Sequence, residues 1–307
     1  MVLRRAEFAG KFYPAFKGEL IRGIEDCFLS KDFGPGVKLE IKKQDQRTVI
    51  GGVSPHAGYI YSGPCAAYTY LNLFRERIPD TVIILGNHHH PYSKIGIMKE
   101  GEWVTPLGNL KIDEDLAKLI LAESNIVVED KAGFLNFREH NIEVQLPFIK
   151  YCAREKEIEI LPIKIARTTS HSKLNEFSSQ IAGIINKYDK DIIIVASSDM
   201  SHYNVFDEEQ LKTLKEIDQL VIDQFLKLNS EYVLNPESFI NKTLFNKFSI
   251  GEREPSVCGR QTIAALILIC KKLNFSKPNV LKYYNSKEIS PGGHPWTVGY
   301  FSGILVK

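Results

Sequence analysis

The chain has 307 residues, a formal net charge of +2, and 44% hydrophobic against 25% charged residues. This composition is sufficient for a large folded core, and the balanced charge argues against nucleic acid held by bulk electrostatics. The longest apolar run, 263–270, is far shorter than the roughly 18 residues of a membrane span, and the N-terminus lacks the apolar segment of a signal peptide. Five widely spaced cysteines without a CxxC motif are typical of a reduced compartment. We therefore expect a cytoplasmic protein without membrane association.

Apolar strand-like runs alternate with helical patterns along the chain. The predicted strands are 48–53, 81–85, 95–98, 158–165, 191–196, 280–284 and 298–306. The predicted helices are 64–74, with Pro64 in its first turn, 113–122, with Asp113 as its N-cap, 139–153, with a kink at Pro147, and 174–187, 208–228 and 257–273. This alternation predicts an α/β fold, a three-layer α/β/α sandwich around a mostly parallel sheet. No linker divides the chain, so we expect a single domain over 1–307.

Three of the predicted strands end in loops that carry histidine. His56 follows the first strand, His88-His89-His90 follows the second, and Asp199 and His202 follow the strand 191–196. Ligands bind beyond the carboxyl ends of the strands in open α/β sheets, so these loops predict one metal or acid/base pocket. Adjacent side chains cannot all face one point, so only one or two of the consecutive histidines can be ligands, and the choice between His88 and His89 stays open. Each histidine taken alone is equally consistent with a structural role in its loop.

Asp199 and His202 are three residues apart, and a helical turn would place both on one face. The carboxylate could then ligate a metal, or orient an imidazole that acts as acid or base. The alternative is an ordinary turn that Asp199 caps.

Cys258 opens the last apolar helix, close to Arg260. A helix N-terminus and a guanidinium both stabilise a thiolate, which is the reactive and metal-ligating form. The alternative is a small buried residue, as Cys270 in the same helix is expected to be. The segment 139–145 carries Glu139 and Glu143 four residues apart at a predicted helix start; its polar residues are either partners of the site or a solvated face.

Six short motifs, taken together, resemble the Memo family. They are SPHAGY at 54–59, GNHHH at 86–90, TPLG at 105–108, EHNIEVQLPF at 139–148, SSDMSHY at 197–203 and CGR at 258–260. The family is similar in fold to the class III extradiol (LigB-like) non-haem iron dioxygenases. The resemblance implies His56, His89 and Cys258 as metal ligands. It places other polar residues nearby as catalytic, substrate-contacting or outer-shell groups: Asp199, His202, His90, His140, Glu143, Tyr59 and Arg260.

The ligand set that the resemblance implies differs from that of extradiol enzymes, because a cysteine stands where they have a carboxylate. Such a set favours Fe(II), with copper or zinc as alternatives. A thiolate beside activated oxygen is readily oxidised, which argues against ring cleavage of catechols. Asn87-His88 stands where the family usually has Pro-Ser, so the choice of His89 rests on the residues that follow it.

Three functions are consistent with these features. The first is a metal-dependent oxidoreductase in which His202, Asp199 and Cys258 act on a small organic or peptide ligand; the resemblance also implies partners from a radical-SAM system. The second is a scaffold that binds a peptide or phosphopeptide through Arg260 and the histidines. The third is a metal-free hydrolase with Cys258 as nucleophile, His56 or His202 as base, and Asp199 as orienting group. The helix 208–228 packs either within the domain or against another subunit, so an oligomer is one of two expectations.

Overall fold

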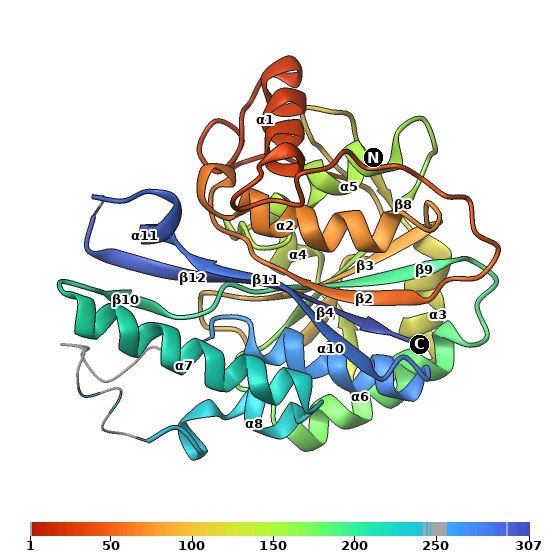
Figure 1. Cartoon of the computed structure of the whole chain (residues 1–307). Helices are drawn as coiled ribbons and strands as arrows, with labels where there is room; N and C mark the ends of the chain where they lie inside the picture. The colour runs from red at the N-terminus through yellow and green to blue at the C-terminus, as the bar shows by residue number, and fades with distance from the viewer. Residues whose placement is uncertain (1, 242–243, 245, 247–256, 293) are drawn as a thin grey trace.

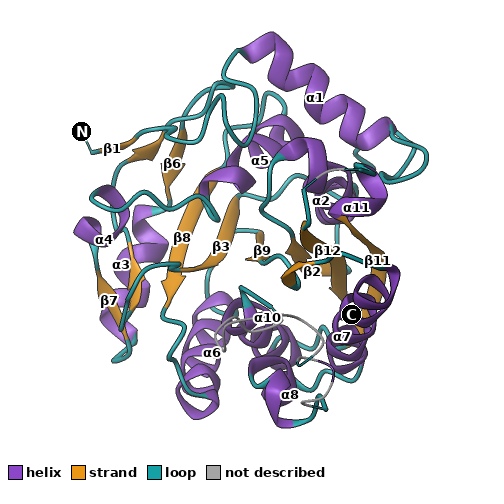
Figure 2. Ribbon diagram, turned by 90° about the vertical axis from the view of Figure 1, so that its left-hand side faces the viewer, coloured by secondary structure: helices purple, strands orange, loops and turns teal. Residues whose placement is uncertain are grey.

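A central sheet lies between two layers of helices (Figure 1). The structure is a computed structural model that describes residues 2–241, 244, 246, 257–292 and 294–307. Helices α1, α2 and α5 cover one face of the sheet, and α6, α7, α8 and α10 cover the other, as both views show (Figures 1 and 2). This arrangement confirms the three-layer α/β/α sandwich.

Within the described residues the sheet has 12 strands. They are β1 (Leu3–Arg4), β2 (Val49–Ser54), β3 (Thr81–Asn87), β4 (Ile95–Ile97), β5 (Glu102–Trp103), β6 (Leu110–Ile112), β7 (Val127–Glu129), β8 (Glu159–Ile165), β9 (Ile192–Ser197), β10 (His202–Asn204), β11 (Lys277–Asn285) and β12 (Trp296–Val306). The helices are α1 (Lys17–Leu29), α2 (Tyr59–Phe74), α3 (Glu114–Glu123), α4 (Lys131–Leu135), α5 (Leu146–Ala153), α6 (His171–Ile185), α7 (Glu208–Leu226), α8 (Ser230–Leu234), α10 (Arg260–Lys272) and α11 (Ser286–Ile289), with 3₁₀ turns at Glu143–Gln145 and Pro236–Ser238.

The middle of the sheet is parallel, in the order β6-β8-β3-β9-β2, and antiparallel strands flank it. Strands β2, β3 and β9 are buried along their whole length, which explains why their sequences are continuous apolar runs. Ser54 pairs with Ser197, and Leu85 pairs with Ala196. The three strands therefore end side by side, and the loops that follow them share one edge of the sheet.

The structure corrects the sequence prediction around two prolines. Helix α2 begins at Tyr59, so Pro64 lies inside the helix and not in its first turn. Residues 139–142 are not helical, and α5 begins only at Leu146 with Pro147 in its first turn, so this proline starts a helix and does not kink one. Glu139 and Glu143 therefore do not share a helical face. The sequence analysis also missed α1, whose buried face is Leu20, Ile24, Cys27 and Phe28.

Asp113 caps α3 as expected, since its carboxylate accepts a hydrogen bond from the Leu116 N–H. No helix in the described part of the chain is long and apolar enough to span a membrane.

Candidate metal centre

Three side chains from distant parts of the chain meet beyond the carboxyl ends of the central strands. His56 follows β2, His89 follows β3, and Cys258 lies two residues before α10. Their ligand atoms all lie within 4.8 Å of one another. The His56 Nε2 is 3.2 Å from the Cys258 sulfur, and both side chains are almost fully buried.

The tautomer of His56 is set by Ser197, the last residue of β9. The Ser197 hydroxyl has one proton, and it donates this proton to the Asn141 carbonyl oxygen at 2.6 Å. It must therefore accept the hydrogen bond from His56 Nδ1 at 2.9 Å. Nδ1 therefore carries a proton, and Nε2 is the nitrogen that faces Cys258, which is the orientation a metal ligand requires.

Gln145 fixes the orientation of this serine in turn. Its amide Nε2 donates to the Ser197 hydroxyl at 2.8 Å, and its amide oxygen accepts from the Tyr70 hydroxyl at 2.7 Å. The Pro55 carbonyl oxygen, 3.0 Å from the amide nitrogen, distinguishes the two ends of the amide, because a carbonyl oxygen can only accept. A buried chain from Tyr70 through Gln145 and Ser197 therefore orients His56.

Glu139 orients the second imidazole. The His89 backbone N–H and its Nδ1 both donate to the Glu139 carboxylate at 2.8 Å, so Nε2 is the ring nitrogen that faces Cys258. Burial opposes protonation of this ring, but hydrogen bonds with Cys258 and Glu139 raise the pKa of His89 to about 10. A carboxylate bonded to the distal nitrogen of a metal-ligating histidine is a recurrent feature of metal sites.

The surroundings of Cys258 favour its thiolate form. Burial opposes ionisation, but His56 and His89 lower the pKa of the thiol well below its usual value. The Asp199 N–H also donates to the sulfur at 3.3 Å. The N–H of Gly259, the residue after Cys258, donates to the Ser198 hydroxyl at 2.9 Å. This hydrogen bond connects the start of α10 to the end of β9.

Asp199 and His202 lie at the edge of this group, although the connection between them is extended and not a helical turn. One Asp199 oxygen accepts from the His56 N–H at 2.7 Å, and the other lies 3.8 Å from His202 Nε2. Burial opposes ionisation of Asp199, but His56 and His202 lower its pKa to about 2. Burial likewise opposes protonation of His202, but the neighbouring Asp199 carboxylate raises the pKa of the imidazole. The pair is therefore a carboxylate beside a ring that readily takes a proton.

His140 packs flat on His89, with ring centroids 4.9 Å apart and 7° between the planes. Burial and the charge on His56 lower the pKa of His140 to about 3, so the ring is neutral. His89, Glu139 and His140 form a second group of potential ligands, but Glu139 is already engaged in orienting His89. His140 thus forms a neutral wall beside the three-ligand group.

The remaining candidate residues face elsewhere. His88 is buried and stacks on Tyr92, whereas His90 is exposed. Glu143 accepts hydrogen bonds from the Phe8 N–H and the Tyr13 hydroxyl, at 2.7 and 2.8 Å. Two further candidates bond away from the three-ligand group: Tyr59 donates to the Val144 carbonyl, and Arg260 pairs with Glu237.

Sequence reasoning missed Ser197, Gln145 and Tyr70. Ser197 and Gln145 lie inside the motifs SSDMSHY and EHNIEVQLPF, yet uncharged residues at the end of a strand and before a helix carry no pattern that indicates a metal site. Their role depends on a hydrogen-bond chain between β9, α2 and the 3₁₀ turn Glu143–Gln145.

The donor set fits a metal ion. Two protein ligands at about 2.0–2.3 Å from one ion in tetrahedral geometry lie about 3.5 Å apart. The 3.2 Å separation of His56 Nε2 and the Cys258 sulfur is close to this value. Two imidazoles with their outer nitrogens occupied and one thiolate are ligands suited to iron, copper or zinc.

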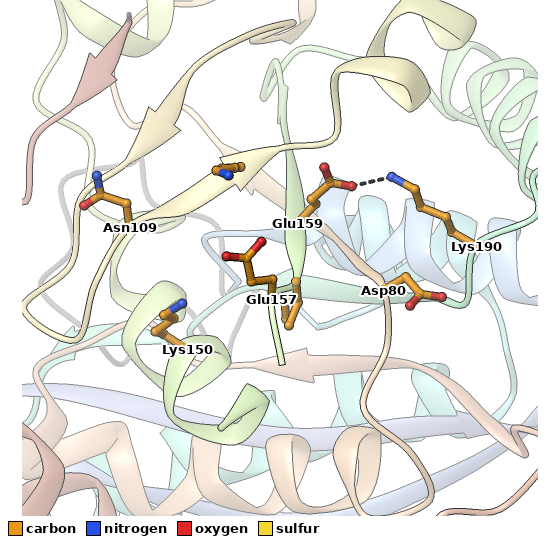
Figure 3. Close-up of a pocket in the computed structure, with 8 residues that line it drawn as sticks. Asp80, Asn109, Lys150, Glu157, Glu159 and Lys190 are labelled. Carbon is orange, nitrogen blue, oxygen red and sulfur yellow. Dashed lines mark hydrogen bonds and ion pairs between the residues drawn. The ribbon is translucent and has the colours of Figure 1, made fainter. Parts of the chain in front are cut away.

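A cavity of about 520 Å³ lies at the edge of the sheet opposite to the three-ligand group (Figure 3). Asp80, Glu159 and Lys190 stand at the amino ends of β3, β8 and β9 there. Its acidic and basic side chains compensate one another, as the ion pair of Glu159 with Lys190 illustrates. The cavity therefore has no part in the three-ligand group.

Comparison with known proteins gives a consistent family. Residues 4–304 match the model of the family described as Memo-like protein. A protein of Sulfurisphaera tokodaii is 38% identical over 305 residues, 98% of each chain, and one of Pyrobaculum arsenaticum is 37% identical over 303 residues, also 98% of each. Both are named MEMO1 family protein. Among solved structures, an uncharacterized protein of Escherichia coli K12 has 12% identity and a TM-score of 0.48, over 84% of this chain and 99% of its own.

Proposed function

The chain belongs to the Memo-like family, and on that premise we propose that it is a metal-dependent oxidoreductase whose iron or copper is held by His56, His89 and Cys258. The observation that carries the proposal is the convergence of three ligand atoms in which the outer nitrogen of each imidazole is already bonded to the protein. Ser197 bonds Nδ1 of His56, Glu139 bonds Nδ1 of His89, and the neighbouring imidazoles lower the pKa of the Cys258 thiol.

A bound Fe(II) or copper ion would supply one-electron chemistry and, with three protein ligands, would leave coordination positions for substrate. Fe(II) is the first choice, because the resemblance to the Memo family implies a likeness in fold to non-haem iron dioxygenases. The side chains around the ion define the rest of the reaction.

We assign proton transfer to His202. Its ring is half-buried and its Nε2 lies 3.8 Å from the Asp199 carboxylate, which favours the protonated form. His202 is therefore positioned to give a proton to a bound substrate and to recover it afterwards. Asp199 stays ionised and holds the ring in place, while neutral His140 closes the other side.

Metal content tests this proposal directly. Protein is purified without oxygen, and iron, copper and zinc are measured in wild type, His89→Ala and Cys258→Ala. The matched controls are His90→Ala, since His90 is the exposed neighbour, and Cys270→Ala, since Cys270 is buried in α10 away from the site. We expect stoichiometric metal in wild type and both controls and its loss in the two ligand variants. Equal metal content in all five proteins would contradict the three-ligand site.

A second candidate function, a cysteine hydrolase, has one observation in its favour. The 3.2 Å contact between the Cys258 sulfur and His56 is also the geometry of a nucleophile and its base. The two are separated by the rate at which iodoacetamide alkylates Cys258. A ligating thiolate is shielded when Fe(II) or Zn(II) is added, whereas a hydrolase nucleophile reacts at the same rate with and without metal.

The scaffold function has less support, because Arg260 is paired with Glu237 at 2.9 and 3.0 Å and offers little free charge to a phosphopeptide.

A further inference from the structure

A pocket of about 300 Å³ lies beside the candidate metal centre, and the proposed chemistry does not yet use it. Three parts of the chain form it: the beginning of α2, the short helix α11, and the first half of β12. Figure 2 shows α11 beside α2, where these parts meet. Its size is at the lower end of the range for small-molecule sites.

Three of the nine residues that line the pocket are Tyr or Trp. Tyr61 and Trp296 stand at its mouth with 37% and 46% of their surface exposed, while Val298 and Tyr300 are buried beneath them. Large aromatic side chains that stay exposed around a hollow are typical of a surface that binds a ligand. The two rings at the mouth offer flat faces to an aromatic group.

The pocket is adjacent to the candidate metal centre. Ala57, which lines it, directly follows the ligand His56. The Trp296 ring lies 6.1 Å from the ring of His202, and His202 pairs with Val298 across the sheet. A molecule bound in the pocket is therefore adjacent to the residue to which we assign proton transfer.

Two groups on the lining attract an anion. Within the described part of the chain, the Lys287 ammonium has no carboxylate at ion-pair distance. The backbone N–H of Trp296 donates a hydrogen bond to Nδ1 of His294. Nδ1 is therefore an acceptor, and the ring proton is on Nε2, which can donate to a ligand. One ammonium and one N–H donor match a single negative charge, as on a carboxylate, better than a dianionic phosphate.

We propose that this pocket binds an aromatic carboxylate, with its ring against Tyr61 and Trp296 and its carboxylate on Lys287 and His294. The inference deepens the proposed function by naming the substrate class. Only the reaction of this molecule rests on the proposed metal chemistry; its binding does not.

Tryptophan fluorescence during a titration with phenylacetate tests the pocket. The chain has two tryptophans, and Trp103 is buried, so Trp296 reports on the pocket. We expect saturable quenching by phenylacetate, absent in Trp296→Phe, and at least about tenfold weaker binding of the uncharged phenylacetamide, because a charge-assisted hydrogen bond is lost. Lys287→Gln should weaken phenylacetate binding about tenfold and leave phenylacetamide unchanged, while Lys287→Arg retains most of the affinity. Lys118→Gln, an exposed lysine of α3, is the matched control.

Several results would overturn the inference. Wild type could bind phenylacetate and phenylacetamide equally well, or Lys287→Gln could bind phenylacetate as tightly as wild type. Phenyl phosphate could bind more tightly than phenylacetate. Finally, about 10 mM phenylacetate, which saturates a millimolar site, could cause no quenching. The titration is repeated on Cys258→Ala treated with EDTA. Unchanged phenylacetate binding in that protein supports the pocket even if the metal proposal fails. We expect Lys287→Gln to leave the metal content unchanged, so that the metal site and the pocket are tested independently.

Discussion

At the scale of single residues, the candidate centre depends on which nitrogen of each imidazole carries the proton. His56 and His89 both present Nε2 to Cys258, because Ser197 and Glu139 occupy the other nitrogen. A free imidazole in water divides its proton between both nitrogens, so these partners prepare the rings for metal before it arrives.

Ser197→Ala should weaken metal binding about 10- to 100-fold, since His56 then loses the acceptor that fixes its tautomer. Competition with a chromogenic chelator measures the dissociation constant. Ser178→Ala is the matched control. Ser178 is another fully buried serine, in α6, and its hydroxyl has no hydrogen-bond partner within the described residues. The tautomer argument is wrong if the two variants bind metal equally well.

At the scale of elements, the end of β9 and the start of α10 pack so closely that only glycine fits between them. A Cβ on Gly259 would lie 2.6 Å from the Ser197 carbonyl oxygen and 2.6 Å from the Ser198 Cβ. Since backbone cannot move aside as easily as a flexible side chain, the first turn of α10 and with it Cys258 would have to shift.

Gly259→Ala should therefore destabilise the fold by about 1–3 kcal/mol and weaken metal binding. Gly183→Ala provides the contrast, because a Cβ at this position of α6 meets nothing within 4 Å and should stabilise the helix by about 0.5–1 kcal/mol. Urea denaturation of EDTA-treated proteins gives both values. A Gly259→Ala protein as stable as wild type would show that the junction adapts.

Helix α7 anchors the connection between β9 and β10 through one buried carboxyl group. Asp218 accepts hydrogen bonds from the Ser201 N–H and the Tyr283 hydroxyl, at 3.0 and 2.8 Å. Burial raises the pKa of Asp218 from 3.8 to about 6. A carboxyl group with a raised pKa favours the folded state when protonated, so its contribution is full below about pH 4 and is lost as the pH rises through 6.

Asp218→Asn should consequently be more stable than wild type at about pH 8, by up to about 3 kcal/mol, and show little difference at about pH 4. The amide keeps an acceptor for the Ser201 N–H and can donate to the Tyr283 hydroxyl. Urea midpoints of metal-free protein at the two pH values test this. A difference that is the same at both would mean that the carboxyl group of Asp218 does not ionise in this range.

At the scale of the whole molecule, the candidate centre joins segments that are far apart in the chain. His56 and Cys258 are separated by 202 positions, and they meet only because β2, β9 and the start of α10 are assembled. The unfolded chain has no such site, so metal bound by the native protein stabilises the fold as a whole.

We expect the free energy of unfolding to rise by about 2.7 kcal/mol at a metal concentration one hundred times the dissociation constant. Thermal unfolding with and without added Fe(II), under exclusion of oxygen, measures the effect. Cys258→Ala should show no increase. An equal increase in both proteins would indicate that the stabilising metal binds elsewhere.

The sequence alone indicated the central strands of the sheet, most of the long helices and the histidine-bearing loops, because continuous apolar strands, strand-helix alternation and histidines directly after strands are local patterns; the ligand set came from the resemblance to the Memo family. It failed where local patterns conflict with packing. Pro64 suits a helix start yet lies inside α2, and Glu139 and Glu143 have helical spacing yet bind different partners, His89 and Tyr13.

Only the tertiary structure showed that His89, and not His88, lies with His56 and Cys258, because neighbours in sequence differ only in the direction that the folded loop gives them. It alone placed Ser197 and Gln145 behind His56, and Trp296 beside His202. Hydrogen bonds and ring contacts of this kind join segments many residues apart. A sequence pattern shows which side chains are present near a strand end, but their direction and partners follow from how distant elements pack.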